Sequence, residues 1–209
     1  MRCGLLGEKL GHSYSPALHA LFGDYDYELF EVSPDRLGDF LRVRDFQGLN
    51  VTIPYKTTML AICDDLTETA ATIGSVNTVL KQLDGSLLGD NTDAAGFEGM
   101  VWKSRIRILG RKCLVLGSGG ASLSAQYVLR KLGAGEVVVI SRTGENNYDN
   151  LDRHQDAAVI VNATPVGMYP NTAASPVDLR QFPHCEGVLD LIYNPARTAL
   201  LQQAETLGI

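Results

Sequence analysis

Short apolar runs alternate with longer amphipathic stretches along the chain, a pattern typical of α/β proteins built on mainly parallel sheets. In the first half, strands are expected at residues 3–7, 27–32, 48–53, 76–80 and 86–89, the last two as a hairpin. Helices are expected at about residues 34–43, 56–63 and 68–73. A further helix begins near Ser15, which we place at its N-cap, with Pro16 at the first helical position. The first half therefore predicts an open α/β domain.

The second half repeats strand and helix more regularly. Helices are predicted at about residues 94–102 and 123–132, and strands at residues 112–117, 136–140, 158–162 and 187–191. The polar stretch between the second and third of these strands is short for a crossover helix, so we expect a trimmed connection there. The order resembles a Rossmann-like fold. Because a polar junction precedes the first strand, we predict one domain at residues 1–103 and a second at residues 104–209.

Composition and charge exclude several classes of protein. A net charge of −6, spread without runs, argues against nucleic acid or an anionic membrane surface as the main partner. The N-terminus lacks the pattern of a signal peptide, and no apolar stretch is long enough for a membrane span. The four cysteines stand far apart and form no C-x-x-C pair. We therefore expect reduced thiols, no metal site and a cytoplasmic protein.

A glycine-rich turn follows the first strand of the second domain. It reads Gly117-Ser118-Gly119-Gly120-Ala121. Glycines at such a turn let the backbone approach a pyrophosphate, whose negative charge suits the N-terminus of the following helix. Serine replaces the third glycine of the usual fingerprint, so a purely structural turn remains an alternative for this stretch alone.

The next strand ends in Ser141-Arg142-Thr143, where NAD-binding domains usually place a carboxylate for the ribose hydroxyls. An arginine there can pair with the 2′-phosphate of NADP, whereas a carboxylate would repel that phosphate. A solvated surface arginine is the alternative. The sequence therefore predicts NADP(H) rather than NAD.

Polar side chains gather at predicted strand and helix ends of the first half. They are Ser13, Ser15, Asn50, Thr52, Lys56, Asn77 and Asp93. Hydroxyls and free N–H groups at a helix start can hold a carboxylate, although plain N-capping explains Ser15 equally well. Lys56 is expected at a helix start, where the macrodipole disfavours a cation, so a functional role gains weight. Each stretch alone is more often structural than functional.

Taken together, the motifs resemble those of the shikimate dehydrogenase family. H-S-Y-S-P, N-V-T-I-P-Y-K, I-G-S-V-N-T and G-D-N-T-D match its substrate-domain motifs in the family's order. G-S-G-G-A, S-R-T, N-A-T-P-V-G-M and D-L-I-Y-N-P follow and match its cofactor-domain motifs. The resemblance runs from about residue 5 to residue 201.

The resemblance implies an NADPH-dependent, reversible reduction of 3-dehydroshikimate to shikimate in aromatic amino-acid biosynthesis. Lys56 and Asp93 match the family's catalytic pair. An amine beside a carboxylate can give a proton to the alkoxide formed by hydride transfer and take it back in the reverse reaction. The substrate-binding positions implied are Ser13, Ser15 and Tyr193 for the carboxylate, and Thr52, Lys56, Asn77 and Asp93 around the ring.

The resemblance also implies where the cofactor lies. The pyrophosphate would lie on Gly117, Ser118, Gly119, Gly120 and Ala121, the 2′-phosphate on Ser141, Arg142 and Thr143, and the nicotinamide against Ala163, Thr164 and Leu191. The family often has asparagine at the position of Ser141 and a basic residue near Glu145. The 2′-phosphate site is therefore expected to depend mostly on Arg142.

Two alternatives remain open. One is a quinate/shikimate dehydrogenase with a relaxed choice of substrate or cofactor. The other is a chain that binds its ligands without turnover, because family members usually continue beyond the position of Ile209 with helices that pack on the substrate domain and a glutamine that contacts the substrate. The sequence is compatible with a monomer or a homodimer.

Overall fold

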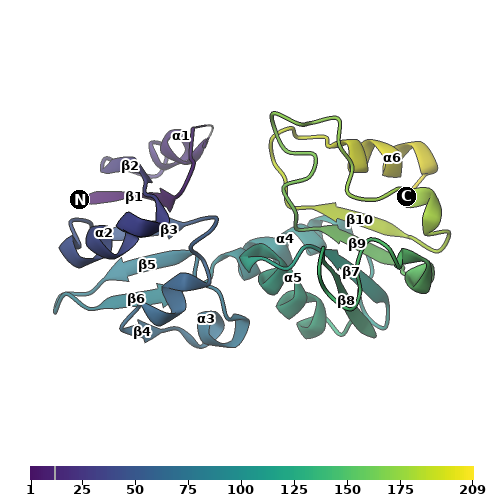
Figure 1. The fold of residues 1–209 in the computed structure, drawn as a ribbon, viewed down its shortest axis with the longest axis horizontal. Helices are drawn as coiled ribbons and strands as arrows, with labels where there is room; N and C mark the ends of the chain where they lie inside the picture. Colours follow the sequence, from purple (N-terminus) through teal and green to yellow (C-terminus); the bar gives the residue numbers. More distant parts are fainter. Residues whose placement is uncertain (12) are drawn as a thin grey trace. The chain divides into compact units, whose positions relative to one another are not determined.

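The computed structural model describes residues 1–11 and 13–209, so His12, the first residue of the H-S-Y-S-P motif, lies outside the described residues. The chain forms two compact units, residues 1–92 and 93–209 (Figure 1). The division precedes helix α4 (Asp93–Ser104), whereas the sequence placed α4 in the first domain. The reason is that α4 packs against α5 (Gly120–Lys131), where Glu98 forms an ion pair with Lys131 at 2.7 Å.

A mixed sheet with the strand order β2-β1-β3-β5-β6-β4 forms the first unit (Figure 1). Its strands are β1 (Arg2–Gly7), β2 (Asp26–Glu31), β3 (Gly48–Val51), β4 (Asp65–Leu66), β5 (Thr78–Lys81) and β6 (Leu87–Asp90). β1 runs parallel to both of its neighbours, and β5 is antiparallel to β3 and β6. The predicted β5–β6 hairpin is thus confirmed, with Gly85 at a φ of +86° in its turn.

Short helices connect these strands. They are α1 (Ser15–His19), the 3-10 turn η1 (Pro34–Arg36) with α2 (Leu37–Val43), the 3-10 turn η2 (Thr58–Ala61) and α3 (Glu68–Ile73). Ser15 lies inside α1 and Tyr14 is the N-cap, so the prediction of Ser15 as N-cap was wrong by one position. The prediction of a helix at residues 56–63 is also wrong, because the first carbonyl of that segment pairs with another part of the chain. The Lys56 carbonyl accepts a hydrogen bond from the Val76 N–H (2.8 Å), and only η2 follows.

The apolar sides of these elements enclose one core in the first unit. Its most deeply buried members include Leu6, Phe46, Leu49, Tyr55, Met59, Val79 and Leu87. Tyr55 fits there because its hydroxyl donates to the carbonyl oxygen of Val32. The core anchors β1 and β3, whose carboxyl ends carry the polar motifs.

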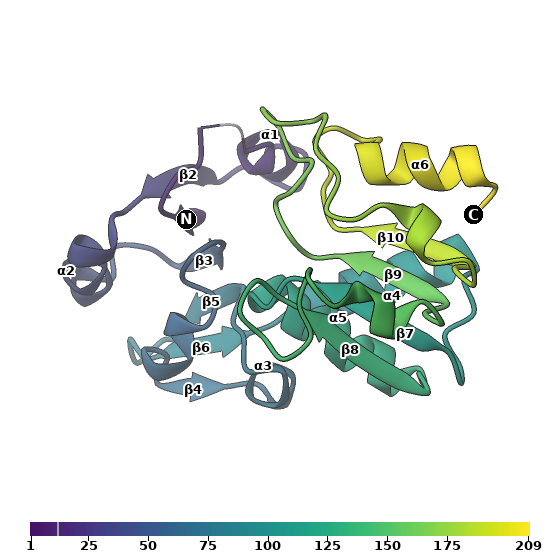
Figure 2. The same ribbon diagram turned by 45° about the vertical axis from the view of Figure 1, so that its right-hand side comes forward.

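A parallel sheet with the order β10-β9-β7-β8 forms the second unit (Figures 1 and 2). Its strands are β7 (Lys112–Leu116), β8 (Glu136–Ile140), β9 (Val159–Asn162) and β10 (Gly187–Asp190). The chain leaves β7 to form β8 on one side and β9 on the other. The carboxyl ends of β7 and β9 are therefore the topological switch point, where open α/β sheets bind ligands.

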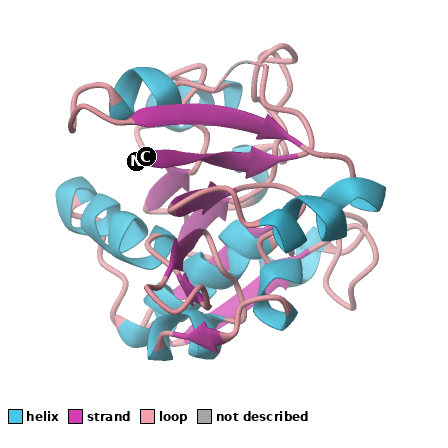
Figure 3. Ribbon diagram, turned by 90° about the vertical axis from the view of Figure 1, so that its left-hand side faces the viewer, coloured by secondary structure: helices cyan, strands magenta, loops and turns pink. Residues whose placement is uncertain are grey.

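Helices of the second unit complete an α/β fold. Besides α4 and α5 they are the 3-10 turns η3 (Leu151–His154) and η4 (Leu179–Gln181) and the helix α6 (Ala199–Leu207). Figure 3 distinguishes the helices and strands of the described chain by colour. α6 was not predicted from the sequence. Its N-cap is Thr198, whose hydroxyl accepts from the Leu201 N–H at 3.3 Å. Within the described residues, no helix is long and apolar enough to cross a membrane.

The first core gives a stability prediction. Leu49→Ala removes a side chain that is 2% exposed, so we expect the free energy of unfolding to fall by about 2–5 kcal/mol. Leu83→Ala, at a fully exposed leucine of the same unit, is the control and should change it by less than about 0.5 kcal/mol. Urea unfolding followed by circular dichroism measures both, and equal losses would contradict the assignment of the core.

Candidate functional site

Hydroxyl groups form a connected chain at the start of α1. The Ser13 hydroxyl donates to Ser15 Oγ (3.1 Å) and accepts from the Ser15 N–H (3.2 Å). Ser15 in turn hydrogen-bonds Tyr27, whose hydroxyl donates to Asn50 Oδ1 at 2.6 Å. Burial raises the pKa of Tyr27 to about 12, so this hydroxyl stays protonated. The two serines predicted to hold a carboxylate are thereby tied to the end of β3.

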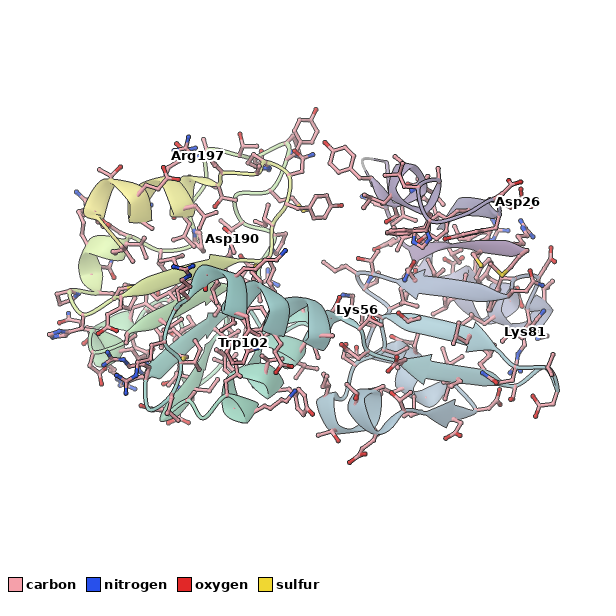
Figure 4. The ribbon with its side chains drawn as sticks, turned by 180° about the vertical axis from the view of Figure 1, so that it is seen from behind. Asp26, Lys56, Lys81, Trp102, Asp190 and Arg197 are labelled. Carbon is pink, nitrogen blue, oxygen red and sulfur yellow. The ribbon has the colours of Figure 1, made fainter. Side chains whose placement is uncertain are left out.

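Thr52 and Lys56 follow β3 and lie beyond its carboxyl end. The Thr52 N–H donates to the carbonyl oxygen of Leu6 (2.9 Å), which continues the pairing of β3 with β1 for one more residue. Lys56 lies half-buried in the turn before η2 (Figure 4). The bond from Val76 to its carbonyl holds the backbone from which its amine extends.

Asn77 holds the last residue of the first unit in place. It is 8% exposed, its Oδ1 accepts from the Thr92 N–H (2.8 Å), and its Nδ2 donates to Thr92 Oγ1 (2.9 Å). Asp93 follows directly and begins α4 in the second unit. Asn77 therefore fixes the chain just before Asp93, a structural role that is compatible with the predicted contact to a ring hydroxyl. Lys56 and Asp93 belong to different units, and their pairing stays a prediction.

Two neighbouring polar residues that the sequence analysis did not select stabilise the same loop. Asp90 Oδ1 accepts from the Thr67 hydroxyl (2.6 Å), and the buried Asn91 donates through Nδ2 to the carbonyl oxygen of Ser75 (2.8 Å). The polar density of G-D-N-T-D was the available signal. These hydrogen bonds connect the loop after β6 to the segments around α3.

The glycine-rich turn lies at the switch point of the second sheet. Gly117 has a φ of +103°, and a Cβ built on it would stand 3.0 Å from the carbonyl oxygen of Ala163. Only glycine fits where the turn after β7 meets the loop after β9. Gly119 is the N-cap of α5, and the described atoms leave open space within 4 Å of an added Cβ. The backbone of this turn is thus exposed at a helix N-terminus, as a pyrophosphate site requires.

Ser122, which replaces the third glycine of the fingerprint, is fully buried in α5. Its hydroxyl accepts from Gln126 Nε2 at 3.0 Å, so its polar atom is satisfied inside the helix packing. The substitution therefore leaves the close packing of α5 on the sheet intact.

Asn162 and Asp190, missed by the sequence analysis, join the loops after β9 and β10. Asn162 is fully buried, accepts from the Thr164 N–H (3.0 Å) and donates to Asp190 Oδ1 (3.1 Å). Asp190 also accepts from the Ile192 N–H (3.0 Å) and, through Oδ2, from the Thr198 hydroxyl (2.7 Å); Figure 4 labels this aspartate. This network holds in one geometry the segments predicted to line the nicotinamide.

The remaining predicted residues lie on the same unit with more exposure. Arg142 and Thr143 are exposed just beyond β8, and Ser141 is half-buried. Tyr193 is 64% exposed, in a loop held by the bond from the Tyr169 N–H to the carbonyl oxygen of Asn194 (3.0 Å). Its predicted contact with a substrate carboxylate stays a prediction.

Comparisons with known proteins find similar sequences among shikimate dehydrogenases. Residues 5–79 match the family described as the shikimate dehydrogenase substrate binding domain. The shikimate dehydrogenase (NADP(+)) of Clostridium perfringens strain SM101 is 36% identical, over 99% of this chain and 83% of that protein. The shikimate dehydrogenase (NADP(+)) of Methanopyrus kandleri is 36% identical over 98% of this chain and 81% of that protein.

Solved structures of shikimate and quinate dehydrogenases are also similar to this chain. Shikimate dehydrogenase 1 of Peptoclostridium difficile superposes with a TM-score of 0.91 at 34% identity, covering 99% of this chain and 83% of that chain. Shikimate 5-dehydrogenase of Thermus thermophilus, solved in complex with NADP(H) and shikimate, has a TM-score of 0.87 at 36% identity and covers 100% and 85%. A quinate dehydrogenase of Corynebacterium glutamicum in complex with NAD has a TM-score of 0.85 at 26% identity and covers 100% and 86%.

Two glycine variants separate a structural turn from a ligand site. Gly117→Ala forces a positive φ on alanine, so we expect a loss of about 1–2 kcal/mol in unfolding free energy. Gly119→Ala meets open space and should cost only about 0.5–1 kcal/mol at the N-cap, but its methyl group should weaken NADP⁺ binding by at least about tenfold. Urea unfolding and calorimetric titration measure the two effects. Unaltered NADP⁺ affinity in Gly119→Ala would remove the pyrophosphate from this turn.

Proposed function

The chain belongs to the shikimate dehydrogenase family, and from this premise we propose that it reduces 3-dehydroshikimate to shikimate reversibly with NADPH. One observation carries the proposal. At 36% identity the whole chain aligns with a Thermus thermophilus enzyme whose structure holds NADP(H) and shikimate. The reaction is a step of aromatic amino-acid biosynthesis. The chain is accordingly an NADP-dependent oxidoreductase.

The second unit fits the cofactor. The turn at Gly117 has a φ of +103°, which L side chains rarely adopt, and α5 presents its free N-terminal N–H groups beside it. We assign the pyrophosphate to Gly117–Ala121, the 2′-phosphate to Ser141–Thr143 and the nicotinamide to Ala163, Thr164 and Leu191. When bound, NADPH supplies the hydride for the carbonyl carbon of the substrate. No carboxylate stands at the end of β8 to repel the 2′-phosphate there, since Ser141, Arg142 and Thr143 occupy that position.

We assign to Lys56 the transfer of a proton to and from the substrate oxygen. As the carbonyl oxygen of the substrate gains negative charge, the Nζ ammonium donates a proton to it, and the amine accepts that proton in the reverse direction. Asp93 is assigned to the neighbouring ring hydroxyl as its hydrogen-bond acceptor, and to the orientation of the lysine. The Asn77–Thr92 bonds support this role, because they fix the backbone immediately before Asp93.

The substrate's other groups are assigned to the polar edge of the first unit. Ser13 and Ser15 bind the carboxylate, and their orientation is maintained through Tyr27. Thr52 and Asn77 bind ring hydroxyls, and Tyr193 adds a hydroxyl for the carboxylate. Hydroxyl and amide groups suit a neutral polyol ring, since a site built to pair a hydroxyl strongly rejects a substrate that lacks it.

A quinate or shikimate dehydrogenase that uses NAD is the second candidate, favoured by the likeness to the NAD-bound quinate dehydrogenase. Arg142 at the end of β8 favours NADP(H). Measuring kcat/KM for shikimate and quinate with NADP⁺ and NAD⁺ distinguishes the two. A preference for quinate with NAD⁺ would replace the first proposal by the second.

The role of Lys56 gives the direct test of the proposed mechanism. Lys56→Ala should lower kcat for NADPH formation from shikimate by about 10²–10⁴-fold, because it removes the proton acceptor. NADP⁺ affinity should be retained. Lys103→Ala, at an exposed lysine near the end of α4, is the matched control and should keep wild-type turnover. If Lys56→Ala and wild type turn over equally fast, the lysine has no part in proton transfer.

A further inference from the structure

The crossover between β8 and β9 is built from asparagines instead of an α-helix. Parallel strands are usually joined by a crossover connection of a dozen or more residues, which in most proteins contains an α-helix. Here residues 144–150, which we call the asparagine loop, lead into the short turn η3. The loop follows Arg142 and Thr143 directly, so its geometry constrains the backbone of these two residues.

Side-chain amides tie the asparagine loop to its own backbone. Asn147 Nδ2 donates to the carbonyl oxygen of Gly144 (3.1 Å), and its Oδ1 accepts from the Asp149 N–H (2.9 Å). Asn150 Oδ1 accepts from the Asn147 N–H (2.9 Å), and its Nδ2 donates to the carbonyl oxygen of Glu145 (2.8 Å). These bonds satisfy backbone groups that a helix would otherwise pair.

The loop also closes back onto the end of β8. The Ser141 N–H donates to the carbonyl oxygen of Asn146 (3.2 Å), and Ser141 forms a β-bridge with Asn147. A Cβ on Gly144 would stand 2.6 Å from Ser141 Oγ, so the closure is tight. Arg142 and Thr143 thus occupy a closed turn, although both side chains are exposed.

The core of the second unit anchors this closed turn. Tyr148 and the buried Leu151 pack into it. His154, 7% exposed, lies with Nε2 at 3.0 Å from Asn146 Oδ1. Because an amide oxygen only accepts, the ring nitrogen donates in this bond.

Burial favours the neutral form of His154. Burial and the nearby Lys112 ammonium lower the pKa of His154, and Arg153 acts in the same direction. The carboxylates of Glu136 and Asp156 act in the opposite direction but do not reverse the shift. The imidazole is therefore neutral at neutral pH and keeps its single N–H for Asn146.

We propose that Asn147 and Asn150 are positioning residues that set the preference for NADP(H) over NAD(H), by holding Arg142 and Thr143 ready for the 2′-phosphate. The inference rests on the proposed function, which assigns the 2′-phosphate to Arg142. A loop already closed before binding loses less conformational entropy when the phosphate arrives. Since the two cofactors differ only in that phosphate, the benefit falls on NADP(H) alone.

Titration with cofactor fragments tests this without turnover. Adenosine 2′,5′-bisphosphate carries the 2′-phosphate, and adenosine 5′-monophosphate does not. We expect Asn147→Ala and Asn150→Ala to weaken binding of the bisphosphate by about tenfold and to leave that of the monophosphate unchanged, the effect of one or two lost hydrogen bonds. In turnover the loss should appear in KM for NADPH rather than in kcat. Asn171→Ala, at an exposed asparagine of the same unit, is the control.

Each other outcome overturns the inference. Equal weakening of both fragments would mean general loosening of the unit, and unchanged binding of both would mean that the loop positions nothing. If Asn147→Ala fails to fold, Asn150→Ala, which keeps the Gly144 and Asp149 bonds, decides by the same readout. Arg142→Ala separates the two proposals. Bisphosphate binding that survives this variant rejects the 2′-phosphate site itself, whereas binding lost in Arg142→Ala but kept in both asparagine variants rejects only their positioning role.

Discussion

Buried hydrogen bonds at the carboxyl ends of the strands are the constraint on which the rest of this structure depends. A parallel sheet leaves polar backbone at its ligand-binding edge, and groups buried there without a partner are costly. In the second unit Asn162 and Asp190 meet this requirement, and with Thr198 they tie the loops after β9 and β10 to the start of α6. A fully satisfied network of this kind gives the loops one geometry. These side chains therefore fix the backbone of the loops to which we assign the nicotinamide site.

The first unit solves the same problem with different residues. Asn77 joins the start of β5 to Thr92 after β6, and the hydroxyl chain from Ser13 to Asn50 joins α1, β2 and β3. Both devices place hydrogen-bonding groups on backbone that packing already fixes. Substrate groups can then be recognised without first ordering a flexible loop, which lowers the entropic cost of binding.

Much of the fold follows from the sequence, because buried parallel strands appear as continuous apolar runs and the glycine-rich turn at residues 117–121 marks a strand end. Two of the failures share a cause, which is a contact with a segment distant along the chain. Residues 56–63 have helical composition, but the Lys56 carbonyl pairs with a residue of another segment. The sequence of α4 carries no sign of its packing on α5, so the division of the chain into two compact units just before α4 was not predicted. α6 was missed although Thr198 is a good N-cap.

Some residues of the candidate site could be predicted from the sequence, and others could be recognised only in the structure. Residues with recognisable motifs, such as Gly117 and Arg142, could be selected from the sequence alone. Asn162 and Asp190 begin two of the quoted motifs, but their structural role could not be predicted, because it lies in a bond between positions 28 apart along the chain. The asparagine loop is similar. Its residues look like an ordinary polar connection until the bonds of Asn147 and Asn150 to the backbone are seen.

We propose that this chain transfers a hydride between NADP(H) and the ring carbon that is the carbonyl of 3-dehydroshikimate and bears a hydroxyl in shikimate. Isotope transfer tests it most directly. The chain is supplied with 3-dehydroshikimate and NADPH that carries deuterium in place of both hydrogens of the reactive nicotinamide carbon, and the product is examined by NMR and mass spectrometry. We expect shikimate that carries deuterium on the former carbonyl carbon. Bound NADPH and substrate with no deuterium in the product would contradict it.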